Sequence, residues 1–135
     1  MKKEIYILPG LFIGETPSMG RGVFTTEYIG AGTIVEISPV VIMSAADRKL
    51  LDLTRLHDYI FEWGEGETAE KQCCMALGYI AVYNHSYSSN CEYEMDVDAA
   101  LIRIHAVRDI DAGEELFINY NGDWNDGKPL WFDAK

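Results

Sequence analysis

Residues 92–98 read Glu-Tyr-Glu-Met-Asp-Val-Asp, and polar and apolar side chains alternate there without a break. Successive side chains of a β-strand point to opposite faces of a sheet, so this alternation is typical of a strand with one buried and one solvated face. A second apolar stretch, 101–107, follows after the short connection 98–100. We therefore predict that the two stretches pair as an antiparallel hairpin.

Short apolar runs recur along the rest of the chain, separated by 12 glycines and 4 prolines. This spacing predicts many short strands and argues against a helix bundle. Pro39 lies near the far end of one run, and because proline cannot donate to a strand ladder we expect that strand at a sheet edge. The further strand candidates are residues 4–8, 20–26, 33–41, 59–63 and 115–120.

One helix is predicted, from Ser44 to Leu56. Ser44 and Asp47 fit a capping box at its start, and Leu50, Leu53 and Leu56 recur on one face. Residues 73–83 are almost wholly apolar and should be buried, but their periodicity does not distinguish helix from strand.

The chain of 135 residues has the size of one domain, residues 1–135. Hydrophobic residues make up 48%, as in an ordinary globular protein. The 11 Lys and Arg against 22 Asp and Glu give a net charge of −11, which opposes nucleic-acid phosphates and suits a basic peptide partner. We expect no membrane association, since no apolar run approaches the roughly 20 residues of a span, and the N-terminus does not resemble a secretory signal.

The three cysteines, Cys73, Cys74 and Cys91, are an odd number with two adjacent, and they include no Cys-x-x-Cys pair. This is a poor disulfide framework and a poor zinc site. We expect a reduced, intracellular protein whose cysteines are small buried side chains.

Three segments carry polar chemistry, and each alone has an ordinary structural interpretation. Gly20-Arg21-Gly22 could let the backbone approach an anionic ligand, but a plain turn is the better interpretation of this segment by itself. Residues 83–91 read Tyr-Asn-His-Ser-Tyr-Ser-Ser-Asn-Cys behind a buried run, and by themselves they favour a capped turn. Residues 113–120 read Gly-Glu-Glu-Leu-Phe-Ile-Asn-Tyr, in which the tyrosine alone would be a core side chain with its hydroxyl at the rim.

Taken in order and at their spacing, the three segments resemble the SET domain, the lysine methyltransferase module. The matching patterns are Gly-Arg-Gly-Val-Phe, Tyr-Asn-His-Ser-x-x-x-Asn and Ala-Gly-Glu-Glu-Leu-x-x-x-Tyr, and the resemblance covers about residues 5–122. It is closest to bare SET domains of bacterial or viral type. It implies a mostly β fold, the β-clip, with several short curled sheets and few short helices. In that fold the C-terminal segment passes under an earlier loop as a pseudoknot, an exception to the rule against threaded chains.

The resemblance also implies a site for S-adenosylmethionine, which leaves as S-adenosylhomocysteine. In this chain the implied pocket residues are Gly20, Arg21, Gly22, Tyr83, Asn84 and His85. Asn84 is expected near the methionyl amine, and His85 is expected to hold the adenine through its backbone rather than act as a base. Tyr120 is the implied catalytic residue, at the mouth of a lysine channel. Tyr59 and Ile118 are expected to line that channel, and Tyr83 is a second candidate for its wall.

The chain departs from the family pattern at several positions. Tyr87 stands where relatives often have a zinc-binding cysteine, and no cysteine follows Cys91, so we predict no metal. Ser89 replaces a frequent proline, and Ile118 replaces a frequent aromatic residue that influences the number of methyl groups added. The tail, residues 123–135, is expected to dock near the cofactor site, where Trp124, Trp131 or Phe132 would cover the adenine.

Protein lysine methylation is therefore the predicted function, with a lysine-bearing protein or basic peptide as partner. Acidic side chains of the alternating stretch could attract such a peptide, namely Glu92, Glu94, Asp96 and Asp98. A solvated strand face is the simpler interpretation of these residues. One alternative is an inactive SET-fold module that binds basic peptides, and another is a hydrolase using Cys91 and His85. The sequence leaves open monomer or homodimer, and cytoplasm or nucleus.

Overall fold

The structure is a computed structural model, and it describes residues 5–64 and 72–120. The predicted hairpin forms as β8 (Cys91–Asp96) and β9 (Leu101–Ala106), with Glu92 opposite His105 and Asp96 opposite Leu101. Its connection is closed by the Ala99 N–H, which donates to Asp96 Oδ1 at 3.0 Å. The alternation over residues 92–98, together with the apolar stretch 101–107 after a short connection, thus predicted both strands and their pairing.

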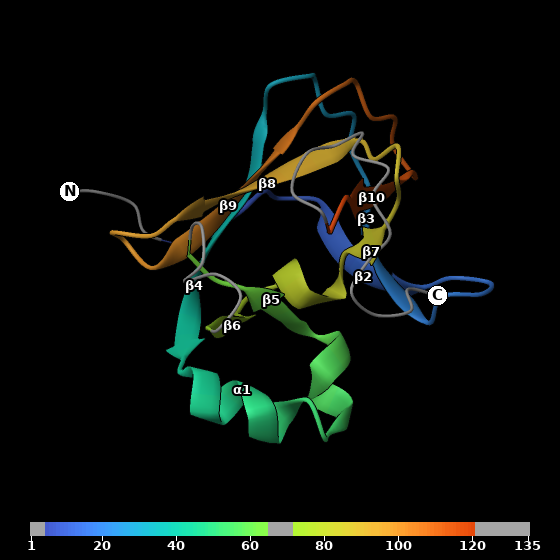
Figure 1. The fold of residues 1–135 in the computed structure, drawn as a ribbon. Coiled ribbons are helices and arrows are strands. Elements are labelled where there is room, and N and C mark those ends of the chain that lie inside the picture. The colour runs from blue at the N-terminus through green and yellow to red at the C-terminus, as the bar shows by residue number, and fades with distance from the viewer. Residues whose placement is uncertain (1–4, 65–71, 121–135) are drawn as a thin grey trace.

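The hairpin belongs to the larger of two sheets, whose strand order is β5-β6-β4-β9-β8, with β1 paired to β4 (Figure 1). The remaining strands of this sheet are β1 (Tyr6–Ile7), β4 (Ile34–Met43), β5 (Ile60–Glu62) and β6 (Cys73–Ala76). The short helices are α1 (Ala45–Leu51), η1 (Arg55–Asp58) and η3 (Ile80–Val82). The predicted mostly β fold is therefore confirmed.

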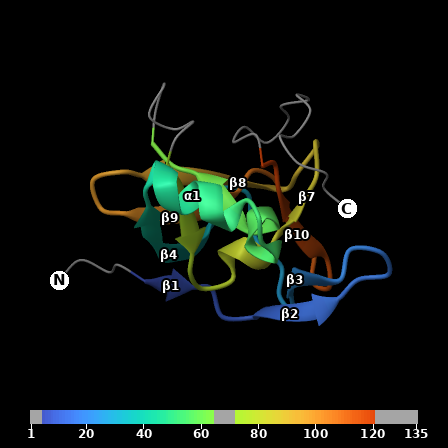
Figure 2. The ribbon, with the colours of Figure 1, turned by 60° about the horizontal axis from the view of Figure 1, so that its bottom comes forward.

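The smaller sheet joins segments that are far apart in sequence. Its strands are β2 (Leu11–Glu15), β3 (Arg21–Thr25), β7 (Asn84–His85) and β10 (Glu115–Ile118), in the order β2-β3-β10-β7. In Figure 2, β3, β10 and β7 lie side by side at one end of the molecule. β10 runs parallel to β7, with Phe117 opposite Asn84 and Ile118 opposite His85. The second and third motifs therefore meet, whereas the pseudoknot stays a prediction because residues after 120 lie outside the described part.

One hydrophobic core serves both sheets. Val35 of the large sheet and Val23, Leu116 and Ile118 of the small sheet are completely buried in a single cluster. The apolar stretch that begins at residue 73 resolves into β6 and η3, which also enter this cluster through Ala76 and Ile80. The core thus fixes one sheet against the other and holds the motif strands in place.

The predicted helix 44–56 is too long. Ser44 does cap α1, accepting a bond from the Asp47 N–H, but the helix ends at Leu51. The Thr54 hydroxyl donates to the Leu51 carbonyl at 2.8 Å and accepts from the Leu56 N–H at 3.2 Å, so it closes α1 and starts η1. A threonine that bonds to the backbone in this way competes with helix continuation.

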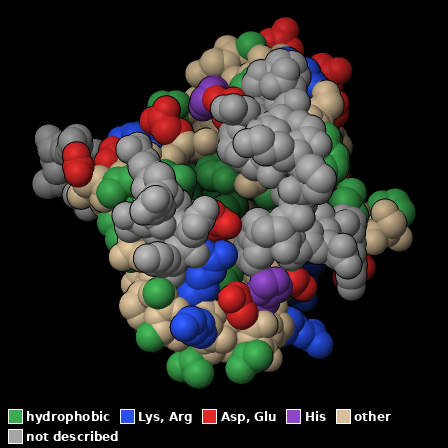
Figure 3. Space-filling model, in the orientation of Figure 1, with side chains coloured by type: hydrophobic (Ala, Val, Ile, Leu, Met, Phe, Trp, Pro, Cys, Tyr) green, Lys and Arg blue, Asp and Glu red, His purple; other side chains and the backbone are tan. Residues whose placement is uncertain are grey.

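The leucine face that this helix was expected to form is not buried. Leu50, Leu53 and Leu56 expose 67%, 85% and 44% of their surface. Hydrophobic side chains accordingly lie on the surface over α1 and η1, at the lower edge of Figure 3.

Two strand predictions also need correction. The strand with Pro39 is central rather than at an edge, since β4 pairs with β9 on one side and with β1 and β6 on the other. Pro39 is opposite Leu101 of β9, where the neighbouring Val40 N–H donates to the Ala100 carbonyl. On the other side of β4, Pro39 lies after the β1 pairing ends at Ile37 and before the β6 pairing begins at Val40, so its missing N–H falls in the gap between those two ladders. The second error is an omission, because no strand was predicted over β2 or over the two-residue strand β7 (Asn84–His85).

Within the described residues, no helix has the length and apolar character needed to cross a membrane.

Candidate active site

The three sequence motifs meet around the side chain of Asn84. Its Nδ2 donates to the Arg21 carbonyl at 3.0 Å and to Glu115 Oε2 at 2.7 Å. Asn84 lies on β7, Arg21 on β3 and Glu115 on β10, so one amide ties together the three neighbouring strands. The sheet, rather than any local motif, creates this cluster.

A side chain at residue 22 would displace the side-chain ends of Glu115 and Asn84 that pair across the strands. A Cβ there would overlap Glu115 Oε2 and would lie 2.9 Å from Asn84 Nδ2. Gly20 serves a different purpose, since its φ of +70° lies in the left-handed region that favours glycine, and a Cβ there would meet open space. The Gly-Arg-Gly segment thus combines a turn with a close approach of strands.

The cluster presents oxygen acceptors. The Arg21 carbonyl and the Glu115 carboxylate both face the Asn84 amide. Burial raises the pKa of Glu115, and the hydrogen bond from Asn84 opposes that effect. Acceptor oxygens of this kind suit a ligand with an ammonium group.

His85 joins this cluster to Tyr120. Its Nδ1 lies 3.1 Å from the Tyr120 backbone nitrogen and accepts that N–H, which places the ring proton on Nε2. Burial lowers the pKa of His85, which favours this neutral form. The Nε2 atom is buried and has no hydrogen-bond partner among residues 5–64 and 72–120. The ring also packs edge-on against Tyr87, at 4.3 Å between centroids.

Tyr120 points its hydroxyl back toward the second motif. The hydroxyl donates to the Tyr83 carbonyl at 2.7 Å, while the Tyr120 carbonyl accepts from the Tyr93 hydroxyl at 3.0 Å. The ring lies edge-on to Phe61, at 6.0 Å between centroids. Burial raises the pKa of Tyr120 to about 12, so the hydroxyl is protonated at neutral pH. It can orient and polarise a neighbouring group, but it is not a base.

The other predicted channel residues lie at different depths. Tyr59 is partly exposed. Burial is the first cause of the raised pKa of Tyr120, and electrostatic repulsion from Tyr59 is the second, so the two phenols lie near each other. Ile118 is completely buried and pairs with His85. The Tyr83 ring is also completely buried, so its carbonyl rather than its ring reaches Tyr120. The roles assigned to these residues stay predictions.

Two further predictions cannot be placed. Trp124, Trp131 and Phe132 lie outside the described residues, as does the whole tail 123–135 assigned to the cofactor site. The absence of a metal also stays a prediction: among residues 5–64 and 72–120, no three His, Cys, Asp or Glu side chains are grouped to hold an ion.

Three residues that build the site had no role in the sequence predictions: Asn90, Glu115 and Phe61. Asn90 stood in the second motif without a role, and its side chain pairs with β10 as a strand would. Its Nδ2 donates to the Glu115 carbonyl and its Oδ1 accepts the Phe117 N–H, both at 2.8 Å. Phe61 packs against Tyr120, and its place in the short strand before residue 64 was the only signal.

The Cys–His alternative finds no support in the geometry. Cys91 is completely buried in the core, and burial raises the pKa of its thiol to about 12. A buried neutral thiol is a poor nucleophile. The Nδ1 of His85 instead accepts from the Tyr120 backbone N–H.

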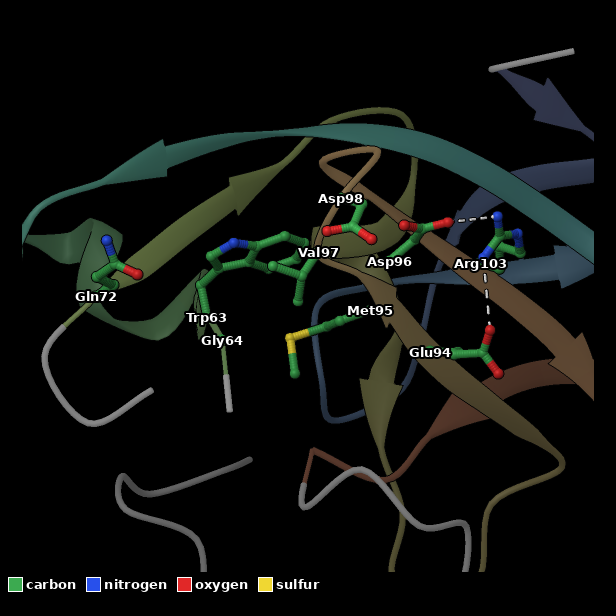
Figure 4. Close-up of a pocket in the computed structure, with 9 residues that line it drawn as sticks. All are labelled: Trp63, Gly64, Gln72, Glu94, Met95, Asp96, Val97, Asp98 and Arg103. Carbon is green, nitrogen blue, oxygen red and sulfur yellow. Dashed lines mark hydrogen bonds and ion pairs between the residues drawn. The ribbon is translucent and has the colours of Figure 1, made fainter. Parts of the chain in front are cut away.

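A separate open cavity of about 590 Å³ lies between the end of β5 and the β8–β9 hairpin (Figure 4). Trp63 and Met95 line it together with the acidic residues Glu94, Asp96 and Asp98. Arg103 bridges two of these carboxylates, at 3.5 Å from Glu94 and 2.7 Å from Asp96. This cavity has none of the three motifs in its described lining.

Comparison with known proteins identifies the fold and its motifs. The family model described as the SET domain matches residues 20–121. A histone-lysine N-methyltransferase of Schizosaccharomyces pombe, described as specific for H3 lysine-37, is 35% identical over 124 residues, which are 91% of this chain and 77% of that protein.

Solved structures agree with this assignment. A Plasmodium falciparum protein assigned as a histone methyltransferase aligns with a TM-score of 0.63 at 29% identity, over 92% of this chain and 98% of that chain. Autoinhibited ctPRC2 bound to S-adenosylmethionine shares the fold, with a TM-score of 0.66 at 23% identity over 84% of this chain and 15% of that chain. The family match over most of its length shows that this chain belongs to the SET-domain family.

Proposed function

We propose that this protein transfers a methyl group from S-adenosylmethionine to the side-chain amine of a lysine in a protein substrate. The single observation that carries this proposal is the convergence of the three SET motifs on neighbouring strands, linked from Arg21 through Asn84 and His85 to Tyr120. The name of the fission yeast relative, a histone-lysine N-methyltransferase, supports the same activity.

The residues present fit the cofactor. The Arg21 carbonyl, the Asn84 amide and the Glu115 carboxylate would hold its methionyl ammonium, because they gather acceptor oxygens at one place. The buried, unpartnered Nε2 of His85 is a further donor within the described part of the site. When bound, the cofactor supplies an electrophilic methyl group on a positively charged sulfonium.

The substrate lysine must lose its proton before it can react. A free lysine has a pKa near 10.4, so deprotonation at pH 7 costs about 4.6 kcal/mol, from roughly 3.4 units at 1.36 kcal/mol each. A dry aromatic channel lowers that cost, since burial disfavours the charged amine. Phe61 and Tyr120 provide such walls on this chain, with Tyr59 at the more exposed side.

Tyr120 then acts as an orienting group. Its hydroxyl donates to the Tyr83 carbonyl, and a hydroxyl oxygen that donates its proton can still accept a hydrogen bond, here from the substrate amine. Because the pKa of Tyr120 is raised to about 12, the phenol keeps its proton at neutral pH. Orientation and electrostatic stabilisation are the contributions that such a group makes.

We further propose that the substrate segment is basic, in keeping with the net charge of −11. The acidic residues of the β8–β9 hairpin would attract it electrostatically. A reduced, intracellular site of action follows from the buried free thiols Cys73, Cys74 and Cys91. The same negative charge disfavours direct nucleic-acid binding.

The test is methyl transfer from methyl-labelled S-adenosylmethionine to a panel of lysine-bearing basic peptides and histones, read by mass spectrometry. Tyr120→Phe removes only the catalytic hydroxyl, and Tyr28→Phe is the matched control because Tyr28 is exposed and its hydroxyl bonds to Asp109, outside the three motifs. We expect transfer by the wild type and by Tyr28→Phe, and a large loss in Tyr120→Phe. An inactive peptide-binding module would instead bind cofactor or peptide and transfer no methyl group to any of them.

A further inference from the structure

Glu36 is a completely buried carboxylate that none of the three motifs contains. It lies on β4 directly after a bulge, because Ile34 faces His105 and Glu36 faces Ile104, leaving β4 one residue longer than β9. A bulge of this kind re-aims the side chains that follow it. Here the redirected side chain turns into the core toward η3.

The carboxylate holds both ends of η3. Its Oε2 accepts from the Tyr79 N–H at 2.8 Å, before the helix, and its Oε1 accepts from the Tyr83 hydroxyl at 3.0 Å, after it. The Ser38 hydroxyl completes the set, donating to Oε2 at 2.7 Å. Three donors converge on one carboxylate, so the position of the segment 79–83 is fixed relative to β4.

The backbone is shaped around this carboxylate. Gly78 has a φ of +66°, and a Cβ there would overlap both Glu36 Oε2 and Ser38 Oγ. The chain therefore needs glycine at residue 78 for two reasons, its left-handed conformation and the space that Glu36 occupies. The close contact between β4 and the start of η3 therefore depends on both the glycine at residue 78 and the carboxylate of Glu36.

Fold stability alone does not account for a carboxylate at this position. Desolvation raises the pKa of Glu36 despite its three donors, so burial still disfavours the charged form. Replacing buried ionic groups by apolar ones is often neutral or stabilising, which argues that such a group is kept for what it positions.

Tyr83 connects Glu36 to the reaction site. Its hydroxyl donates to Glu36, and its carbonyl accepts the 2.7 Å bond from the Tyr120 hydroxyl. Asn84 and His85 follow directly in the chain as β7. We propose that Glu36 is a positioning residue for methyl transfer, which fixes Tyr83 so that its carbonyl orients the Tyr120 hydroxyl. This inference rests on the proposed function.

Two substitutions separate the hydrogen bonds from the charge. Glu36→Gln keeps an oxygen for the Tyr79 and Ser38 donors, and its amide can donate to the Tyr83 hydroxyl oxygen. We expect its kcat within about threefold of the wild type. Glu36→Leu removes every acceptor and should lose at least about tenfold in kcat. A loss in Glu36→Gln as large as in Glu36→Leu would overturn the proposed hydrogen-bonding role.

Tyr83→Phe is the sharpest variant, because it removes only the hydroxyl that reaches Glu36 and leaves the backbone carbonyl. We expect kcat to fall about tenfold while the KM values for cofactor and peptide stay within about twofold. Thr25→Val is the matched control, since it also removes a buried hydroxyl. That hydroxyl donates to the Glu27 carbonyl at 2.7 Å and not to any group at Tyr120 or Glu36. Thr25→Val should lower the unfolding temperature without lowering kcat.

A double variant distinguishes positioning from general destabilisation. If Tyr83 acts through the Tyr120 hydroxyl, Tyr83→Phe should have little further effect on the residual rate of Tyr120→Phe. An unchanged kcat in Tyr83→Phe, or the same tenfold loss on the Tyr120→Phe background, would overturn the inference.

A structural readout keeps the inference testable if the wild type transfers no methyl group. In protein labelled with ¹³C at tyrosine Cζ, the Tyr120 resonance is assigned by its loss in Tyr120→Phe. We expect it to shift in Glu36→Leu and to stay unchanged in Thr25→Val. A resonance that does not move in Glu36→Leu contradicts positioning, while absent transfer with a shifted resonance refutes only the proposed function.

Discussion

The hydroxyl of Tyr120 donates a 2.7 Å hydrogen bond to the carbonyl of Tyr83, which lies 37 residues earlier in the chain. The parallel pairing of β10 with β7 makes this contact possible by bringing the ends of both segments together. The phenol donates its proton to a backbone carbonyl, and its oxygen can still accept a hydrogen bond from a substrate amine. One hydrogen bond thus sets the direction in which the catalytic group can act.

Tyr120→Phe should lower kcat by about 100-fold or more, because removing one preorganised polar group of this kind has effects of that size. Cofactor affinity should change by less than about threefold, since the hydroxyl faces Tyr83 rather than Asn84. Single-turnover rates and calorimetric titration with cofactor measure the two quantities separately. Wild-type rates in this variant would remove Tyr120 from the mechanism.

Gly22→Ala should weaken cofactor binding and destabilise the fold by about 1–3 kcal/mol, because the new methyl group overlaps Glu115 and crowds the Asn84 amide. Gly30→Ala is the matched control, since its Cβ would have its first neighbour at 3.9 Å and its φ is ordinary. Urea unfolding and cofactor titration compare the two variants. Equal behaviour of both alanine variants would show that the close approach at Gly22 is unimportant.

The free energy of unfolding should fall as the pH drops below about 6.5, in part because of His85. Its folded pKa is lowered by burial, so the unfolded chain takes up this proton first. The neutral ring, which accepts the Tyr120 N–H, therefore contributes stability that is complete above pH 6.5 and is lost as the pH falls through the folded pKa.

The variant His85→Asn isolates this contribution, because its amide oxygen can still accept the Tyr120 N–H and does not titrate. Glu36 and Glu115, whose pKa values are raised by burial, act with the opposite sign and are present in both proteins. Urea unfolding should be compared between about pH 7.5 and about pH 5.5, roughly one unit on either side of the ordinary histidine pKa. The free energy of unfolding should fall less over this range in His85→Asn than in the wild type. His57→Asn serves as the control. Identical pH profiles of His85→Asn and wild type would contradict the buried neutral imidazole.

Binding of a basic peptide should weaken as salt rises, since exposed charges are screened over about 10 Å at 0.1 M ionic strength. Glu94→Gln should reduce this salt dependence if the hairpin attracts the peptide, because Glu94 is one of its most exposed acids. Asp47→Asn, on the first turn of α1, is the matched removal of an acid outside the hairpin. Fluorescence anisotropy of a labelled basic peptide measures its affinity for each variant at several salt concentrations. An affinity that does not change from low to high salt would contradict the electrostatic role.

The sequence was informative where a pattern is local. Alternation over residues 92–98 predicted β8 and its hairpin, and the three motifs named the residues that converge in the small sheet. The end of α1 was wrong because a periodic leucine pattern does not show that Thr54 closes the helix through its hydroxyl. Pro39 was misplaced because a strand can change partners at a proline, whose missing N–H then falls in the gap between two ladders.

Long-range partners could not be predicted in this way. Glu36 stands in an apolar strand, and its burial depends on donors at Tyr79 and Tyr83, more than 40 residues later. The interaction of Asn84 with Glu115 likewise depends on the strand order of the small sheet. Motif resemblance predicted which segments matter, while the side chains that brace them emerged only from the packed structure.

The central claim is that the three motifs form one cofactor site, and amide NMR during titration with S-adenosylmethionine tests it most directly. We predict that the N–H resonances of Gly22, His85 and Tyr120 all shift and saturate together with a single dissociation constant, while that of Leu53, in the exposed turn between α1 and η1, does not move. Shifts confined to one motif, or saturation of the three at different cofactor concentrations, would contradict the shared site.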